Sequence, residues 1–403
     1  MDILDGIRIV SFNHFLMGPV GIQLLADLGA DVIAIEPTGG AFQRHWGGAN
    51  KSVDGQSLLF LLGNRNKRSL ALDLKKPEGL AIARKLAAGA DVVSENFRPG
   101  VMEKLGLGYE SLKAENPALI YASASGYGPD GPYAERPGQD LLIQAMSGLM
   151  AITGSREGGA RAVGVSAADH HGAALLAMGI LAALVGRLRS GRGRRVDVNL
   201  LSSAIDLQLE SFSCYLNGEV PDSVRQPKYI SGWYYPAPYG IYPTEDGEVA
   251  ISLSDMATLA EALGLPELAA VTPEEAFTRN QELAESIAGA MAQKPTAAWL
   301  EILERHRIWH ARVNDYAEVV ADPQVRHNRN FITVPGATGA PVTLVSHPVR
   351  YDGAAPEVRL PPQPLGAQNA EILAELGYGT AEIQRLEAKG VISRDKGAVA
   401  GAT

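Results

Sequence analysis

The sequence predicts an α/β protein in which a parallel sheet covered by helices is followed by a smaller α+β domain. Through about the first 125 residues, short apolar segments of strand length alternate with helical segments. The composition then shifts, because residues 221–243 hold five prolines and six tyrosines or tryptophans, which is typical of a linker. With 403 residues, 46% of them apolar, the chain is long enough for two or three domains.

The expected strands of the first domain are compact apolar runs bounded by turn residues. They cover residues 7–12, 31–36, 69–74, 91–96, 119–125 and 195–199. Helices are expected at 18–28, where Gly29 suits the C-terminal cap, and at 77–89, where Pro77 suits the first turn. Long buried helices are expected at 140–150 and 167–188, with a third ending at 216. Strands that alternate with helices favour parallel pairing with both faces of the sheet covered.

The second part of the chain has the pattern of a smaller mixed unit. A strand is expected at 248–253, and helices are expected at 256–263, 273–292 and 296–305. Residues 340–366 are rich in proline and should be extended, and two short helices should follow at 371–376 and 381–389.

Composition and charge exclude several classes of protein. The 36 basic and 45 acidic residues give a net charge of −9, which argues against a nucleic-acid partner. Because the chain has a single cysteine, Cys214, no internal disulfide or Cys-rich zinc site is predicted. Cys214 is expected to be buried. The richest apolar run, residues 172–185, suits a core helix better than a membrane span. Residues 1–10 lack the layout of a signal peptide, and a cytoplasmic location is expected.

Three familiar catalytic or binding patterns are absent or incomplete. The sequence has no HExxH motif, and the adjacent His170 and His171 would point about 100° apart on a helix, so no metal site is expected. Residues 164–168 approach the G-x-S-x-G nucleophile motif, but Ala168 replaces the second glycine. Residues 13–18, which follow the first strand, lack the G-x-G-x-x-G of dinucleotide-binding proteins.

Asp169 has two interpretations. The spacing of Ser166 and Asp169 before a long apolar helix is that of a capping-box variant, with Ser166 as the N-cap. The same position also favours an ionised carboxylate, because the N-terminus of a helix carries partial positive charge. An ionised carboxylate is the form that can act as a nucleophile. The spacing alone leaves both roles open.

A series of motifs in order along the chain closely resembles the class III, or CaiB/BaiF-type, CoA-transferases. The motifs are LDGIRIV at 4–10, GADVIAIE at 29–36, NKRSL at 66–70 with LDLK at 72–75, ENFRPG at 95–100, GYGPDGPY at 126–133 with RPG at 136–138, the segment 164–187, DPQV at 322–325 and LGY at 376–378. The resemblance implies a class III CoA-transferase fold: a large Rossmann-like domain of residues 1–222 and 331–403, and a linker with a small α+β domain at 223–330. It also implies an interlocked homodimer.

The resemblance assigns the chemistry to Asp169, which would attack the thioester of a donor acyl-CoA and carry CoA to a small carboxylic acid. Acyl-CoA is then a substrate, and no permanently bound cofactor is expected. Residues matching the family's CoA-binding positions are Met17, Gly18, Leu72, Asp73, Leu74, Lys75, Asn96, Phe97, Arg98, Lys104, Arg136 and Asp140. Asp140 equally fits an ordinary N-cap of the next helix.

Several residues differ from the family motifs, and these differences argue against some of the family's substrates and reactions. Pro37 stands where some relatives carry a CoA-contacting arginine, and residues 252–256 lack the glycine-rich loop of oxalate-using members. Gln139 replaces the histidine of the related acyl-CoA racemases, which argues against racemase chemistry. A racemase or isomerase, or a non-catalytic CoA-binding protein, are the alternatives. Residues 44–46 (Arg-His-Trp) hint at a polar or dicarboxylic acid substrate or a surface role.

Overall fold

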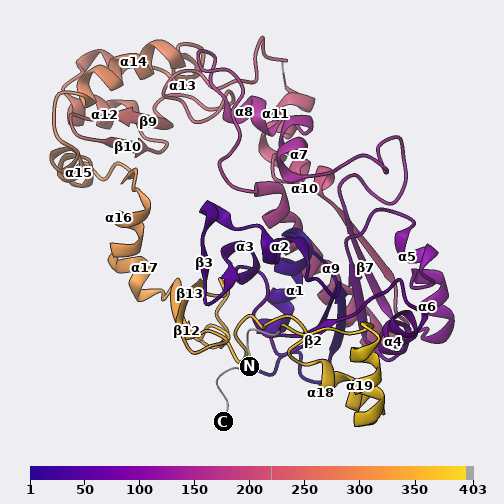
Figure 1. The fold of residues 1–403 in the computed structure, drawn as a ribbon. Coiled ribbons are helices and arrows are strands. Elements are labelled where there is room, and N and C mark those ends of the chain that lie inside the picture. The colour runs from indigo at the N-terminus through magenta and orange to yellow at the C-terminus, as the bar shows by residue number, and fades with distance from the viewer. Residues whose placement is uncertain (219, 396–403) are drawn as a thin grey trace. The chain divides into compact units, whose positions relative to one another are not determined.

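A computed structural model describes residues 1–218 and 220–395 of the chain, which divides into two compact units (Figure 1). Unit 1 comprises Met1–Ile143, Ser166–Ala204 and the chain from Arg326 onward. Unit 2 comprises Gln144–Val165 and Ile205–Val325. These units divide the chain differently from the expected domains, since residues 144–165 and 205–222 belong to unit 2 rather than to the large domain.

Unit 1 is built on a six-stranded sheet in the order β5-β2-β1-β6-β7-β8. All neighbouring pairs in this sheet are parallel. The strands are β1 (Arg8–Phe12), β2 (Asp31–Glu36), β5 (Lys67–Ala71), β6 (Val92–Glu95), β7 (Ile120–Ser125) and β8 (Arg195–Asn199). Counted along the chain, these six strands have the 3-2-1-4-5-6 order of the Rossmann fold, which confirms the predicted α/β fold class.

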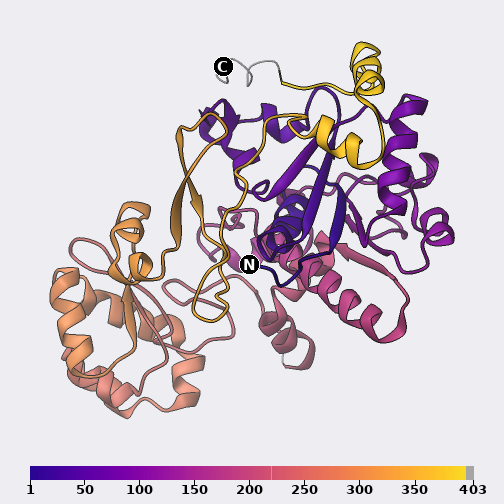
Figure 2. The same ribbon diagram turned by 90° about the horizontal axis from the view of Figure 1, so that it is seen from below.

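Helices cover both faces of this sheet, as Figure 2 shows. On one face α1 (Met17–Asp27) and α9 (Ala167–Ser190) pack on the apolar side chains of β1, β6 and β7. On the other face lie α4 (Pro77–Ala88), α6 (Tyr109–Glu115), α18 (Asn369–Glu375) and α19 (Thr380–Ala388). Successive strand residues point to opposite faces, so each strand supplies both cores, with Ile9 in one and Val10 in the other.

Helix α9 lies close to α1 because glycines stand where the two helices meet. A Cβ atom on Gly21 would be 2.8 Å from the carbonyl oxygen of Ala173, and one on Gly172 would be 3.0 Å from the Cε atom of Met17. By length and composition alone α9 could cross a membrane. The core helix of a soluble protein meets the same criteria, and Leu176 and Ile180 of α9 are fully buried in unit 1.

The C-terminal segment completes unit 1 after the chain has formed unit 2. The backbone N–H of Asp73 donates to the carbonyl oxygen of Val391 at 2.8 Å, beside a bridge between Leu72 and Ile392. β12 (Phe331–Pro335) and β13 (Pro341–Val345) form an antiparallel hairpin, and β13 lies in the segment 340–366 that was expected to be extended. The shorter elements of this unit are β3 (Ser52–Val53), β4 (Gln56–Ser57), α2 (Phe42–His45), α3 (Leu58–Leu61), η1 (Gly48–Asn50) and α5 (Val101–Lys104).

Unit 2 contains a three-stranded antiparallel sheet, in the order β11-β10-β9, packed on helices. Trp299 is fully buried in its core, and its indole N–H donates to the carbonyl oxygen of Met291 at 2.6 Å. Its sheet and main helices are β9 (Gly240–Pro243), β10 (Glu248–Ile251), β11 (His310–Arg312), α12 (Met256–Leu263), α13 (Pro273–Thr278), α14 (Asn280–Met291) and α15 (Thr296–Arg305). Shorter elements are α8 (Leu149–Thr153), α11 (Leu209–Asn217), η2 (Pro266–Ala270) and α16 (Tyr316–Ala321).

Some expected helices are divided, and the reason is visible in the backbone. The helix expected at 140–150 ends as α7 (Asp140–Met146), because Gly148 has a φ of +85° and starts α8 in a new direction. The helix expected to end at 216 is divided into α10 (Leu200–Asp206) and α11. Elsewhere in the chain, α17 (Pro323–His327) follows α16. The expectation that Cys214 is buried was wrong, since it lies exposed on α11.

Candidate active site

The strand order of unit 1 reverses between β1 and β6, and the loops that follow these two strands are tied together. The backbone N–H of His14 donates to Oδ1 of Asn96 at 2.9 Å, and Nδ2 of Asn96 donates to the carbonyl oxygen of His14 at 2.7 Å. Nδ2 of Asn13 donates to Oγ of Ser94 at 2.9 Å. In open α/β sheets, ligands bind outside the carboxyl ends of the strands at such a reversal.

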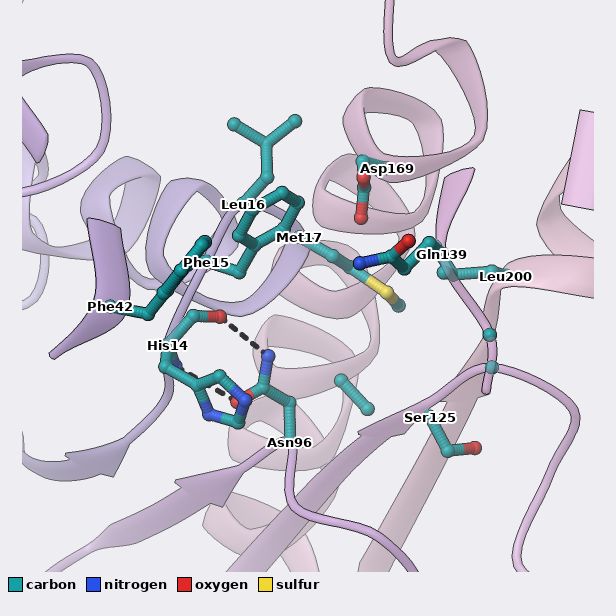
Figure 3. A pocket seen from close by; sticks show the side chains of 13 residues that line it. His14, Phe15, Leu16, Met17, Phe42, Asn96, Ser125, Gln139, Asp169 and Leu200 are labelled. Carbon is teal, nitrogen blue, oxygen red and sulfur yellow. Dashed lines mark hydrogen bonds between the residues drawn. The ribbon is translucent and has the colours of Figure 1, made fainter. Parts of the chain in front are cut away.

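A pocket of about 450 Å³ lies at this point, entirely within unit 1. Figure 3 shows Asp169 and Gln139 facing it from one side and His14, Phe15 and Phe42 from the other. The lining residues are His14, Phe15, Leu16, Met17, Phe42, Asn96, Ala124, Ser125, Gly126, Gly138, Gln139, Asp169 and Leu200. The pocket therefore joins the carboxyl ends of β6 and β7 with the N-termini of α1, α9 and α10.

Asp169 stands in the first turn of α9, and its neighbour Asp140 caps that helix. Oδ1 of Asp140 accepts hydrogen bonds from the backbone N–H groups of Ala168 at 2.8 Å and of Asp169 at 3.1 Å. Ser166 is the N-cap by position, but its side chain makes no capping hydrogen bond. The capping-box interpretation is thus corrected, since the cap comes from a residue 29 positions before Asp169.

The Asp169 carboxyl group is buried next to a second carboxyl group. Burial, and after it the charge of Asp140, raises the pKa of Asp169 to about 7, while the backbone N–H of Met17 hydrogen-bonds the group and lowers its pKa. Its Oδ2 atom is buried and accepts no hydrogen bond from the described residues. A carboxylate held this way is more basic than an exposed aspartate, and one of its oxygens is not engaged in hydrogen bonding.

Three glycines allow close contacts in and beside the pocket. A Cβ atom on Gly126 would stand 2.6 Å from the Cα atom of Gly138, so the end of β7 and the loop before α7 are in direct backbone contact. A Cβ atom on Gly18 would be 2.3 Å from Oδ1 of Asn13, which explains the glycine in the first turn of α1. A larger residue at Gly126 would push against Gly138, which lines the pocket with it.

The opposite wall of the pocket is aromatic. The ring of Phe15 stacks on Trp46 with centroids 5.4 Å apart, and Phe42 lies 5.5 Å from Trp46 and 6.2 Å from Phe15. The imidazole of His14 lies 5.5 Å from the ring of Phe97, and burial lowers the pKa of His14. Of these rings, His14, Phe15 and Phe42 line the pocket on the side opposite Asp169 (Figure 3).

The residues expected to bind CoA are distributed over several places in unit 1. Met17 and Asn96 line the pocket, whereas Arg98 lines a neighbouring cavity of about 410 Å³ at the same sheet edge. Ser125 lines both cavities. That second cavity also contains Glu95, whose pKa is raised to about 7, mainly by burial.

The other residues on that expected list lie outside both cavities. Leu72 is 1% exposed, so its side chain belongs to the core and contributes no surface to a nucleotide site. Asp73 and Leu74 are half-buried where the chain leaves β5, while Lys75, Lys104 and Arg136 are exposed. Arg136 lies over the ring of Tyr133, with its guanidinium carbon 4.1 Å from the ring centroid.

The expected site residues did not include the aromatic side chains that line the pocket, and Arg44 lies outside the pocket. Phe15, Phe42 and Leu200 were not among the expected site residues, because no local spacing brings them together. Arg44 does not line the pocket, since its guanidinium pairs with Glu36 through two contacts of 2.6 Å and covers the Phe60 ring. Within the described ranges, no group of three or more histidine, cysteine, aspartate or glutamate side chains could hold a metal ion.

The fold and the pocket define a class of α/β enzymes that bind a ligand at a Rossmann-type strand reversal beside a buried carboxylate. Residues 4–369 match CoA-transferase family III. The chain is 34% identical, over 98% of its length and 91% of the relative's, to the succinyl-CoA:glutarate CoA-transferase of Mus musculus. It is equally 34% identical to the succinate–glutarate CoA-transferase of Agrobacterium fabrum, over 93% of its length and 95% of the relative's.

A solved structure shares the architecture. The crystal structure of a CaiB/BaiF family protein from Brucella suis superimposes with a TM-score of 0.80 at 33% identity, covering 93% of this chain and 99% of that one. This chain belongs to the class III, or CaiB/BaiF, CoA-transferase family. The α/β fold expected from the family resemblance is thereby confirmed.

Proposed function

We propose that this enzyme moves CoA from an acyl-CoA donor to a carboxylic acid acceptor, with Asp169 as the nucleophile. The carboxylate attacks the thioester carbonyl, forming a mixed anhydride and releasing the CoA thiolate. The thiolate then attacks the aspartyl carbonyl of the anhydride, which gives an aspartyl-CoA thioester and the free donor acid. This path divides one difficult exchange into easier steps.

The acceptor acid completes the exchange. Its carboxylate attacks the aspartyl-CoA thioester, which forms a second mixed anhydride and releases the thiolate again. The thiolate attacks the acyl carbonyl of that anhydride, producing the new acyl-CoA and restoring the Asp169 carboxylate. Each thioester broken is balanced by one formed, so the reaction requires no nucleotide triphosphate.

The observation that supports this proposal is the placement of Asp169. It lines the pocket at the strand reversal, and its Oδ2 atom is buried without a hydrogen bond from the described residues. With a pKa of about 7, a substantial fraction is ionised at neutral pH, and its basicity makes the ionised form a better nucleophile than an ordinary aspartate. The first turns of α1 and α9 add partial positive charge beside it.

The expected test replaces the nucleophile. Asp169→Ala should abolish exchange between acyl-CoA and carboxylic acids while the protein remains folded by circular dichroism. Asp315→Asn is a matched control, because asparagine also caps a helix and Asp315 only caps α16. Near-normal turnover by Asp169→Ala would refute the assignment.

Trapping identifies the covalent step. After incubation with acyl-CoA, hydroxylamine should convert the Asp169 anhydride or CoA thioester into a hydroxamate. Mass spectrometry should locate this hydroxamate on the peptide that contains residue 169. An adduct found only on another residue would exclude Asp169 as the nucleophile.

A second function within the same superfamily is an acyl-CoA racemase or isomerase. Gln139 lines the pocket where a racemase histidine is expected, but His14 also lines it and could accept a proton from a substrate carbon. Solvent deuterium that enters the Cα position of an acyl-CoA without an acceptor acid would favour this function. Exchange that needs the acceptor and leaves Cα unlabelled would favour CoA transfer.

We also infer that the enzyme is an interlocked homodimer in the cytoplasm. Large apolar side chains with high exposure support a second copy, among them Leu188 at 85%, Leu216 at 73% and Leu209 at 66%. Light scattering should give twice the chain mass of 42.7 kDa, and cell fractionation should place the enzyme in the soluble fraction. A monomer at micromolar concentration would contradict the dimer.

A further inference from the structure

The wall of the pocket that faces Asp169 carries aromatic rings and no charge that could hold a second carboxylate. We propose that this site selects acyl groups with an apolar, ring-bearing side chain, such as arylacetic or arylpropionic acids, over dicarboxylic acids. The inference rests on the proposed CoA transfer, and it names the acid that the transfer uses.

Phe15 and Phe42 line the pocket, and the ring of Trp46, outside the lining, packs against both. Phe15 and Trp46 are stacked with an interplanar angle of 14°, and Phe42 contacts both at 37° or less. Phe42 is 59% exposed and Trp46 is 48% exposed, so folding of the chain leaves much of this apolar surface in contact with water. An exposed cluster of this kind beside a reactive group is typical of a site for an apolar ligand.

The placement of Phe15 is held at a conformational cost. Its φ of +67° is rare for a residue with a bulky side chain. Its backbone N–H donates to Oε1 of Gln43 at 3.0 Å, and Gln43 is only 2% exposed. Strained backbone that surrounding contacts hold in place is concentrated at functional sites. Here it directs the Phe15 side chain onto Trp46 and into the pocket lining.

The charges around the pocket oppose a second carboxylate. The thirteen lining residues, all of them described, include no lysine or arginine. The cation nearest in sequence to Phe42 is Arg44. Its guanidinium forms a salt bridge with Glu36, and its side chain is largely buried. Burial lowers the pKa of His14, which disfavours its cationic form. A second carboxylate would therefore lose its hydration beside Asp169 without gaining a cationic partner.

Relatives in the family are named for succinate and glutarate, whereas the lining of this pocket includes no lysine or arginine that could pair with a second carboxylate. An aryl ring, by contrast, could stack on Phe15 or Phe42, which line the same pocket as Asp169, while its carboxyl group points to Asp169. The free energy of one aromatic contact with the acyl group is enough to change kcat/KM by several-fold to about tenfold.

The first experiment measures kcat/KM for phenylacetyl-CoA, hexanoyl-CoA, acetyl-CoA and succinyl-CoA with one common acceptor, acetate. Phenylacetyl-CoA should exceed succinyl-CoA by about tenfold or more, given the stacking surface and the missing cation. Equal values, or a preference for succinyl-CoA, would overturn the inference. Failure of all four donors to exchange would instead refute the proposed function.

The second experiment replaces aromatic residues at the pocket by alanine. Phe42→Ala should lower kcat/KM for phenylacetyl-CoA by about tenfold, and Trp46→Ala, which removes the ring packed against Phe42, should lower it several-fold. Both variants should change the value for acetyl-CoA by less than about twofold. The matched controls are Phe331→Ala and Trp309→Ala, exposed aromatic residues outside the pocket, which should leave both values unchanged. A parallel loss with both donors would show a general effect on folding or CoA binding and overturn the role of the rings.

A gain of specificity completes the test. Phe42→Arg places a cation on the wall and should raise kcat/KM for succinyl-CoA relative to phenylacetyl-CoA by about tenfold or more. A merely structural role for Phe42 predicts that both donors are affected equally, and that outcome would contradict the inference.

Discussion

Two substitutions of Asp140 would separate its two effects on the active site. In Asp140→Asn the side-chain oxygen can still accept from the N–H groups of Ala168 and Asp169, while the negative charge is removed. Since that charge is the second cause of the raised pKa of Asp169, the pKa should fall below about 7. It should not return to its usual value of 3.8, because burial is the larger cause and remains.

Asp140→Ala removes the charge and the cap together. Two buried backbone N–H groups at the start of α9 then lose their acceptor, which should lower the free energy of unfolding by about 2 kcal/mol. The asparagine variant should retain most of this stability. Both variants should move the midpoint of the pH profile of kcat/KM to lower pH.

The assay is the pH dependence of CoA exchange from pH 5 to pH 9, combined with urea unfolding at pH 7. An unchanged or higher midpoint in Asp140→Asn would show that Asp140 does not interact electrostatically with Asp169 as the geometry indicates. Equal stability of the alanine and asparagine variants would refute the capping role.

Three further predictions follow from the site. In the wild-type enzyme, kcat/KM should rise with pH through about 7, because only ionised Asp169 is a nucleophile; a profile that is flat there would contradict this role. Because folding raises the pKa of Asp169 from 3.8 to about 7, stability is lost as pH rises through this range. Relative to Asp169→Asn, the wild type should lose about 2.5 kcal/mol between pH 5 and pH 8 in urea unfolding, and no loss would indicate an exposed carboxylate. Gly138→Ala should reduce exchange at least about tenfold, since its backbone contacts Gly126 at the pocket, and normal kinetics would show that the wall can move freely.

The strands of unit 1 were predictable because buried parallel strands are short apolar runs that turn residues interrupt. The second and last strands of the sheet, Asp31–Glu36 and Arg195–Asn199, match the expected residues at both ends. The expected helix at 140–150 failed at Gly148, where a local apolar pattern continues although the backbone turns. Periodicity reports which residues are buried, and it says little about where a helix bends.

The candidate site was predictable only in part. Asp169 was found through its position before a long apolar helix and the family motifs, whereas its cap was assigned to Ser166 because capping-box spacing is local. The actual cap, Asp140, is distant in sequence, and its side chain reaches α9 only in the folded chain. Lys75, Lys104 and Arg136 were expected to bind CoA, and the structure places them exposed on unit 1 outside the pocket.

By itself the sequence determined the α/β class and the six strands of the parallel sheet, since both depend on composition and spacing within a few dozen residues. The nucleophile candidate came from the family resemblance, because the local spacing left the role of Asp169 open. Only the tertiary structure decided what surrounds that nucleophile. The order of the strands brings the loops after β1 and β6 together, and the positive φ of Phe15 turns its ring toward Trp46. Such contacts join residues far apart in the chain, so their energies leave no periodic pattern in the sequence.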